Sequence, residues 1–266
     1  MSPALTIALL AFLFGGTHVG LAIWPVRRRL VAALGERGYR ALFSAVAAVT
    51  FVILVRSYAS LRMEGAAGFA LGAEPAIRWM LMAVVAFGFV LVLLGLVAYP
   101  RTPAAMFARD VAPPRGIERI SRHPFFAGTA IIGVAHVFLA TRLVGAVLMA
   151  ALATLAIVGG RHQDQKLLRE RGPAYADYLA ETSFLPFLAV LAGRQRIVWS
   201  EIGWRTPLAA VALTCLLRAV HDVIFAGGGA WLIGAVFGGA VVATFQSWRR
   251  ERRRASGTSH EARLAG

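Results

Sequence analysis

Long apolar runs that are almost free of charge constrain this chain more than any other feature. Of its 266 residues, 58% are hydrophobic and only 15% are charged, which is unlike an ordinary soluble domain. A helix needs about 20 consecutive apolar residues to cross a bilayer. We therefore predict an all-α integral membrane protein, a polytopic transmembrane helix bundle with about seven spans, at residues 3–26, 39–61, 76–99, 124–142, 143–160, 207–225 and 230–248.

Two short turns connect predicted spans. The fourth and fifth spans are near the lower length limit of about 17 residues, and a tight hairpin turning at Thr141 to Leu143 would join them. The glycine run from Gly227 to Gly229 is typical of a turn and separates the last two spans. We interpret residues 1–248 as a single transmembrane helical domain.

Positive charge gathers in the segments between the spans. The net charge is +15, and most of the arginines lie in segments 27–38, 100–123, 161–206 and 249–266. Because basic loops stay on the cytoplasmic side, we predict the N-terminus outside, the C-terminus inside, a cytosolic segment 161–206 and a basic, disordered tail 249–266. This distribution argues against nucleic-acid binding, which would need a basic stripe on a soluble fold.

Three histidines lie inside predicted spans, where an ionisable side chain is costly and is usually kept for a function. From the helical rise, His18, His136 and His221 lie about 10, 18 and 21 Å from the inner ends of their spans. Two imidazoles on separate helices can hold a haem iron, whereas a single one more often makes a hydrogen bond between helices. Depth alone favours pairing His136 with His221.

Two charged residues accompany His221 in a span that is otherwise apolar. Arg218 precedes it by three residues, and Asp222 follows directly. Because residues four apart are neighbours on a helix surface, Arg218 and Asp222 can form an ion pair. The alternative is a polar wall around a pocket for a cofactor or substrate.

A second group of polar residues lies where the fourth and fifth spans meet the inner surface. Arg122 and His123 begin the fourth span, and His162 and Asp164 follow the fifth. Hairpin geometry would bring the two histidines together into one polar site. His162 and Asp164 could also bind a metal, although their spacing is weak support. Alternatively, Arg122 and His123 merely start a helix whose first turn contains a proline.

Two further segments of the inner side are apolar without reaching span length. The stretch 163–182 is predicted to be an amphipathic surface helix, anchored by Leu167, Leu168, Tyr175, Tyr178 and Leu179. The run 184–193 is too short to cross a bilayer, so we expect it at the membrane interface.

The single cysteine, Cys215, limits the chemistry of the chain. It excludes an intramolecular disulfide and the Cys-x-x-Cys-His motif that attaches haem covalently. Any haem would therefore be bound non-covalently. No nucleophile elbow, phosphate-binding loop or zinc-protease motif occurs in the sequence, which disfavours hydrolysis and phosphoryl transfer.

Taken in order, the motifs of the chain resemble the NnrU family, which is similar to plant 15-cis-zeta-carotene isomerase. The likeness spans about residues 5–225. Its motifs are His18-Val-Gly-Leu-Ala, Pro25 with Arg27 and Leu-Gly-Glu-Arg (34–37), Arg-His-Pro (122–124), Ala-His (135–136), His-Gln-Asp (162–164) and Thr-Ser-Phe-Leu-Pro-Phe (182–187).

This resemblance implies a membrane-embedded haem b whose reduced iron assists cis-to-trans isomerisation of a polyene during carotenoid biosynthesis. The positions that match the two histidine ligands of the iron are His18 and His136. Gly133 stands where the isomerase pattern has a cysteine, so an alternative ligand is absent. Bacterial NnrU proteins are associated with nitrite and nitric oxide metabolism in denitrification. The resemblance thus implies a bacterial inner membrane and either a hydrophobic small molecule or a nitrogen oxide as substrate.

Two other classes of function are compatible with the sequence. The Arg-His-Pro start, the hairpin and the segment with Gly172, Tyr175 and Tyr178 resemble membrane methyltransferases of the isoprenylcysteine type. His162 and Gln163 stand where those enzymes have an acidic pair, which disfavours S-adenosylmethionine binding. A noncatalytic assembly protein of a respiratory complex would use its intramembrane polar groups only to join helices.

Overall fold

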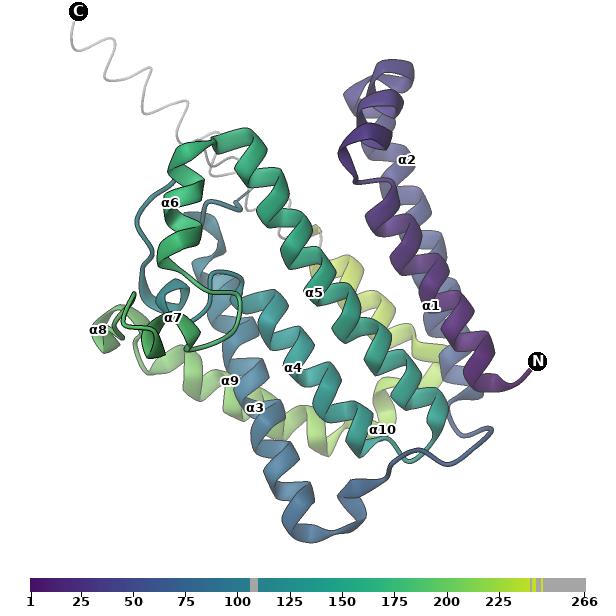
Figure 1. The fold of residues 1–266 in the computed structure, drawn as a ribbon. Coiled ribbons are helices and arrows are strands. Elements are labelled where there is room, and N and C mark those ends of the chain that lie inside the picture. Colours follow the sequence, from purple (N-terminus) through teal and green to yellow (C-terminus); the bar gives the residue numbers. More distant parts are fainter. Residues whose placement is uncertain (106–109, 240, 243–244, 246–266) are drawn as a thin grey trace, which may run out of the picture.

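The computed structural model describes residues 1–105, 110–239, 241–242 and 245. Apart from an isolated β-bridge between Ala67 and Arg142, this described part is built from helices and contains no strand (Figure 1). Four helices are long and apolar enough to cross a membrane: α1 (Pro3–Gly20), α2 (Trp24–Leu61), Pro75–Arg101, which comprises α3 (Pro75–Ala98) and the 3-10 turn η2 (Tyr99–Arg101), and α5 (Leu143–Arg171).

The prediction of an all-α membrane protein is confirmed. Two further apolar helices, α4 (Pro124–Leu139) and Ala226–Gly239, are shorter than the four candidate spans. The count of seven spans is not confirmed, while the orientation of the termini and the single-domain boundary at residue 248 stay predictions.

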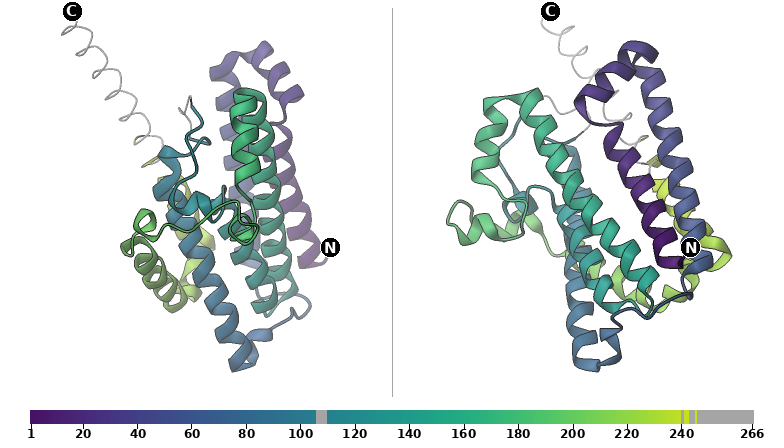
Figure 2. Two further views of the ribbon diagram at one scale, coloured as in Figure 1. Left: turned by 60° about the vertical axis from the view of Figure 1, so that its left-hand side comes forward. Right: turned by 45° about the vertical axis from the view of Figure 1, so that its right-hand side comes forward.

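The helices α3, α4 and α5 lie side by side, and α1 and α2 pack on the other flank of α5 (Figures 1 and 2). Glycines allow this close approach. A Cβ atom on Gly88 of α3 would lie 2.6 Å from Ile132 of α4, and one on Gly133 of α4 would lie 2.8 Å from the Met149 carbonyl oxygen of α5. Small residues at helix contacts are the usual means of packing helices in a membrane.

The link between α1 and α2 differs from the prediction. The expected loop 27–38 is helical and forms the first part of α2, interrupted at Gly35, whose φ is 71°. Pro25 is tolerated because it occupies the first turn, where a backbone N–H has no partner within the helix. The Tyr39 hydroxyl donates a hydrogen bond to the Leu21 carbonyl and ties this turn to the end of α1.

The predicted hairpin between the fourth and fifth spans is confirmed, because α4 ends at Leu139 and α5 begins at Leu143. However, α5 continues past the predicted end at residue 160. It stops before Gly172, whose φ of 57° suits glycine and ends the helix. The next helix, α6 (Pro173–Glu181), runs back along the end of the bundle (Figure 1).

The surface helix predicted for 163–182 is therefore two helices, the end of α5 and α6. Three of its expected lipid anchors, Leu167, Tyr175 and Tyr178, are buried together instead, whereas Leu168 is exposed. The reason is the bend at Gly172, which folds the second half of the segment onto the first.

Short elements complete the inner loops. The apolar run 184–193 contains α7 and packs on the bundle, where Ala189 is buried and Phe187 stacks on Phe87 of α3 with ring centres 5.8 Å apart. The short helices are η1 (Leu71–Ala73), η3 (Gly116–Arg119), α7 (Leu188–Leu191) and α8 (Trp199–Ile202).

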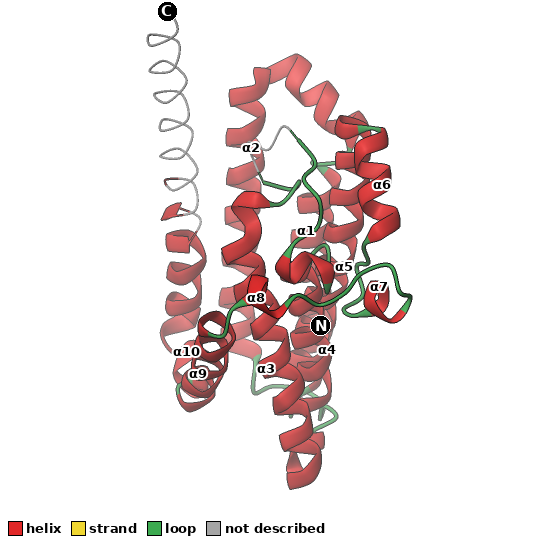
Figure 3. Ribbon diagram, turned by 90° about the vertical axis from the view of Figure 1, so that its left-hand side faces the viewer, coloured by secondary structure: helices red, strands yellow, loops and turns green. Residues whose placement is uncertain are grey.

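The C-terminal part does not form the predicted span 207–225. Instead, α9 (Arg205–Ala219) packs across α3 and is seen nearly end-on in Figure 3, while α3 is seen lengthwise. The helix is interrupted at Val220, and α10 (His221–Ile224) follows. Gly227, Gly228 and Gly229, predicted to form a turn, have positive φ but lie within the helix Ala226–Gly239. The tail 249–266 lies outside the described residues.

Candidate functional site

Two of the histidines that the sequence predicts inside spans lie close together. The imidazole of His136 on α4 and that of His221 at the start of α10 have ring centres 6.4 Å apart, with planes inclined by only 14°. The break after α9 makes this contact possible, because it turns the chain so that α10 reaches α4. The structure thus brings together the pair that depth in the membrane favoured.

A backbone contact orients the ring of His136. Its Nδ1 atom lies 2.9 Å from the carbonyl oxygen of Ile132, one helical turn earlier. Since a carbonyl can only accept, Nδ1 carries the proton in this contact and Nε2 keeps a free lone pair. The ring of His136 is therefore held in one tautomer, with an acceptor nitrogen available.

The glycines near His136 are used for helix packing. A Cβ atom on Gly128 would lie 2.9 Å from Leu91 Cβ of α3, and one on Gly133 would clash with α5. By contrast, Gly16 and Gly20 near His18 have no neighbour within 4 Å of a built Cβ atom. The glycines therefore leave open space near His18 but not near His136.

His18 lies in a different part of the bundle. It lines a cavity of about 310 Å³ between α1, α2, α4 and α5, together with His162. The α4 residues of this cavity end at Thr129, seven positions before His136 and hence about 10 Å away along the helix. The sequence-based pairing of His18 with His136 stays a prediction from the family resemblance.

The residues next to His221 do not form the expected ion pair. Arg218 and Asp222 are both exposed, and the ion pairs of the described residues do not include them. Residues four apart are neighbours only within one continuous helix. Here α9 ends between Arg218 and Asp222, at Val220, which is not helical.

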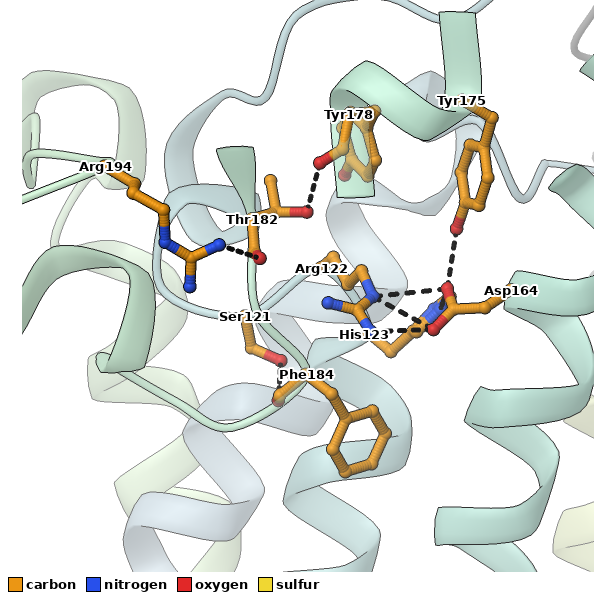
Figure 4. A network of polar contacts seen from close by, with 9 residues as sticks. All are labelled: Ser121, Arg122, His123, Asp164, Tyr175, Tyr178, Thr182, Phe184 and Arg194. Atoms are coloured by element: carbon orange, nitrogen blue, oxygen red, sulfur yellow. Dashed lines mark hydrogen bonds and ion pairs between the residues drawn. The ribbon is translucent and has the colours of Figure 1, made fainter. Parts of the chain in front are cut away.

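Asp164 is the centre of a group of polar contacts where the start of α4 meets the end of α5 (Figure 4). Its carboxylate accepts hydrogen bonds from Arg122 Nη2 at 2.8 Å and from Arg122 Nε at 3.0 Å. It also contacts His123 Nε2 at 2.6 Å and accepts from the Tyr175 hydroxyl at 2.7 Å. We call Arg122, His123, Asp164 and Tyr175 the Asp164 cluster. It ties together the start of α4, the end of α5 and α6.

The expected single site containing His123 and His162 does not form. His123 binds Asp164, whereas His162 lines the cavity and its ring contacts the Ala22 carbonyl. Residues two apart on a helix point to different faces, so His162 and Asp164 serve opposite sides of α5. Among the residues that the structure describes, no group of three or more potential ligands is placed to hold a metal ion.

Neighbouring contacts extend this packing. The Glu118 side chain is buried and accepts a hydrogen bond from the Tyr178 hydroxyl at 2.8 Å, while burial raises the pKa of Glu118. The Ser121 hydroxyl donates to the Phe184 carbonyl (Figure 4). These contacts attach the loop before α4 to α6 and to the segment that follows it.

Sequence reasoning missed several of these residues. Glu118 lies in an ordinary polar loop, and nothing in its neighbourhood indicates burial. The sequence does not predict the hydrogen bonds of the Tyr175 and Tyr178 hydroxyls, because these contacts depend on a fold that periodicity does not specify. Phe43, Phe125 and Phe126, which line the cavity, look like any other lipid-facing aromatic residue in the sequence.

Comparison with known proteins assigns the chain to a family. The model of the NnrU protein family matches residues 6–227, a range that includes His18, His136, His221 and the Asp164 cluster. The chain belongs to the NnrU family. The resemblance read from its motifs is thereby confirmed.

Two curated relatives of this NnrU chain are chloroplastic 15-cis-zeta-carotene isomerases. The Zea mays protein is 26% identical over 225 residues, which cover 81% of this chain and 59% of the relative. The Arabidopsis thaliana protein is 25% identical over 235 residues, which cover 84% of this chain and 61% of the relative. This NnrU chain therefore spans only about three fifths of the length of these relatives. No solved structure matches it.

Proposed function

We propose that this NnrU chain is a membrane haem-b protein in which His136 and His221 would hold the haem iron. The supporting observation is the geometry of the two rings, which are nearly parallel with centres 6.4 Å apart. Two imidazole nitrogens bound at about 2 Å on opposite sides of one metal ion place the ring centres roughly 6 Å apart. The separation of the two ring centres therefore supports an iron held between these side chains.

The surroundings of His136 suit a ligand role. Its Nδ1 donates to the Ile132 carbonyl, the type of outer contact that fixes the tautomer and orientation of metal-binding histidines. Nε2 is then the free donor atom. The neighbouring residues Gly133 and Ala135 are buried, so the part of α4 that carries the ring is packed.

A bound haem would supply a one-electron iron centre whose potential depends on its axial ligands and on the polarity of its surroundings. The chain's own contribution is to hold the two imidazoles, to exclude water with apolar helices and to admit molecules dissolved in the bilayer. By analogy with the isomerases among its relatives, we favour redox-dependent cis–trans isomerisation of a polyene. Activity linked to nitrite or nitric oxide metabolism is the alternative, and we place the chain in a bacterial inner membrane.

Absorbance spectra of the purified protein, oxidised and reduced with dithionite, test this assignment. We expect a Soret band in the wild type that is lost or strongly shifted in the His136→Ala and His221→Ala variants. The His18→Ala variant is the matched control and should keep the wild-type spectrum. A Soret band that persists in the His136→Ala/His221→Ala double variant would contradict the assignment. Loss of the band in His18→Ala, with a normal spectrum for His221→Ala, would instead support the pair implied by the resemblance.

A further inference from the structure

The cavity beside His18 is a second candidate binding site. Its volume is about 310 Å³, and it is lined by residues of α1, α2, α4 and α5. Cavities of about 300 to 1,000 Å³ with mostly apolar walls and a few polar groups are typical of small-molecule sites. The walls include Phe43, Phe125 and Phe126, and the polar side chains are His18, His162, Gln163 and Thr129.

The His18 side chain has an unused hydrogen-bonding atom in these apolar surroundings. Its ring lies between Phe14 and Phe43, with ring centres 5.6 and 5.1 Å away. Its Nδ1 atom is buried and has no hydrogen-bond partner in the described part of the chain. An unpaired polar group in an apolar environment costs on the order of several kcal/mol. Two of the other polar side chains of the cavity have partners within the protein, since His162 contacts the Ala22 carbonyl and Thr129 donates to the Phe125 carbonyl.

We infer that this cavity binds a lipid-soluble ring compound that carries a carbonyl oxygen, of the benzoquinone type. The aromatic walls suit a flat ring, and the imidazole of His18 can donate to a carbonyl through whichever ring nitrogen carries the proton. The cavity lies among candidate membrane-spanning helices, so its occupant would come from the bilayer. A pure hydrocarbon would leave the imidazole unpaired, and the chemistry therefore favours a ligand with one polar group.

This binding site does not depend on the proposed haem ligation. Its residues on α4 belong to the first half of that helix, and His136 lies in the second half. A variant that empties or fills the cavity should therefore leave the environment of His136 and His221 intact, which makes the two assignments separable.

Purified protein in detergent provides the test, with a short-chain alkyl benzoquinone as the probe and an alkylbenzene of equal chain length as the control probe. Binding is measured as the probe-dependent shift of the thermal unfolding midpoint. His18→Phe keeps a flat ring between Phe14 and Phe43 but removes the polar atoms. Leu155→Trp fills the cavity from α5. Thr154→Ala, on an exposed side of the same helix turn, is the matched control.

We expect saturable binding of the benzoquinone to the wild type and to Thr154→Ala, with the alkylbenzene at least tenfold weaker. His18→Phe should weaken benzoquinone binding roughly tenfold, as for the loss of one hydrogen bond, and leave any Soret band unchanged. Leu155→Trp should abolish binding while the midpoint without probe shows a folded protein. Equal binding of the two probes, or benzoquinone binding that is insensitive to both His18→Phe and Leu155→Trp, would overturn the inference. So would loss of the Soret band in His18→Phe with unchanged benzoquinone binding.

Discussion

The two faces of α5 differ in whether their polar side chains find hydrogen-bond partners within the protein. On one face, Asp164 accepts from Arg122 and Tyr175 and contacts His123, so its carboxylate is fully used. On the other face, His162 lines the cavity together with His18, whose Nδ1 is buried without a partner in the described residues. Polar groups whose hydrogen bonds are all made within the protein, such as Asp164, stabilise the fold. Groups without a partner remain available to bind a ligand. One face of α5 therefore stabilises the fold, and the other contributes to a candidate binding site.

Removal of Asp164 should have the largest effect on stability. The Asp164→Ala variant leaves Arg122 and His123, which are largely buried, without their acceptor. Loss of one partner of a buried ion pair strongly destabilises a protein, and we expect a decrease of about 3 kcal/mol in the free energy of unfolding. Denaturant titration followed by circular dichroism measures it. The control is Gln163→Ala on the cavity side, with an expected change within about 0.5 kcal/mol. Similar losses in both variants would show that the two faces do not differ.

The glycines offer a second contrast, between packing and open space. Gly128→Ala introduces a Cβ atom 2.9 Å from Leu91 Cβ, and such overpacking typically costs about 1–3 kcal/mol; we expect about 2 kcal/mol. Gly16→Ala, near His18, meets nothing within 4 Å and should be neutral or slightly stabilising, because alanine favours a helix. Thermal unfolding midpoints of the two variants compare them directly. A destabilised Gly16→Ala variant would refute the distinction.

Much of the architecture follows from the sequence, because apolar length and turn residues act locally. The hairpin at 140–142 and the bundle itself are of this kind. The sequence prediction fails where tertiary contacts determine the structure. The break at Val220 is invisible in an apolar run, yet it separates Arg218 from Asp222 and places His221 against His136. The contact between Asp164 and the Tyr175 hydroxyl likewise depends on how α6 folds back, and helical periodicity does not specify this.

The Tyr175 hydroxyl tests a single contact on the face of α5 that carries Asp164. Tyr175→Phe keeps the ring, which stacks on Tyr178 with centres 5.6 Å apart, and removes only the donor to Asp164. Hydrogen bonds to charged groups contribute about 1.5–3 kcal/mol, and since Asp164 keeps its other donors we expect a loss of about 1.5 kcal/mol. Tyr58→Phe is the control, because the Tyr58 hydroxyl has no hydrogen bond within the described residues. Equal unfolding free energies for the two variants would contradict the assigned contact.

The smallest effect concerns pH and compares two carboxyl groups of the inner loops. Burial raises the pKa of Glu118, so the folded protein binds this proton more tightly than the unfolded chain, and unfolding releases it. The contribution of Glu118 is therefore most favourable below its ordinary pKa of 4.5, and it declines as the pH rises through the raised value. Glu118→Gln keeps an acceptor for Tyr178 and should gain stability relative to the wild type as the pH increases.

Glu201 provides the opposite sign. The hydrogen bond from Arg119 lowers its pKa, so its stabilising contribution is present above the ordinary carboxyl pKa and is lost as the pH falls through the lowered value. Relative to the wild type, Glu201→Gln should lose stability at neutral pH, and the difference should shrink on acidification. Unfolding free energies between about pH 2 and pH 8, a range that extends to both sides of the ordinary carboxyl pKa values near 4, distinguish the two cases. Difference curves of the same sign would contradict the raised pKa of Glu118, because desolvation makes a carboxyl less favourable when it ionises.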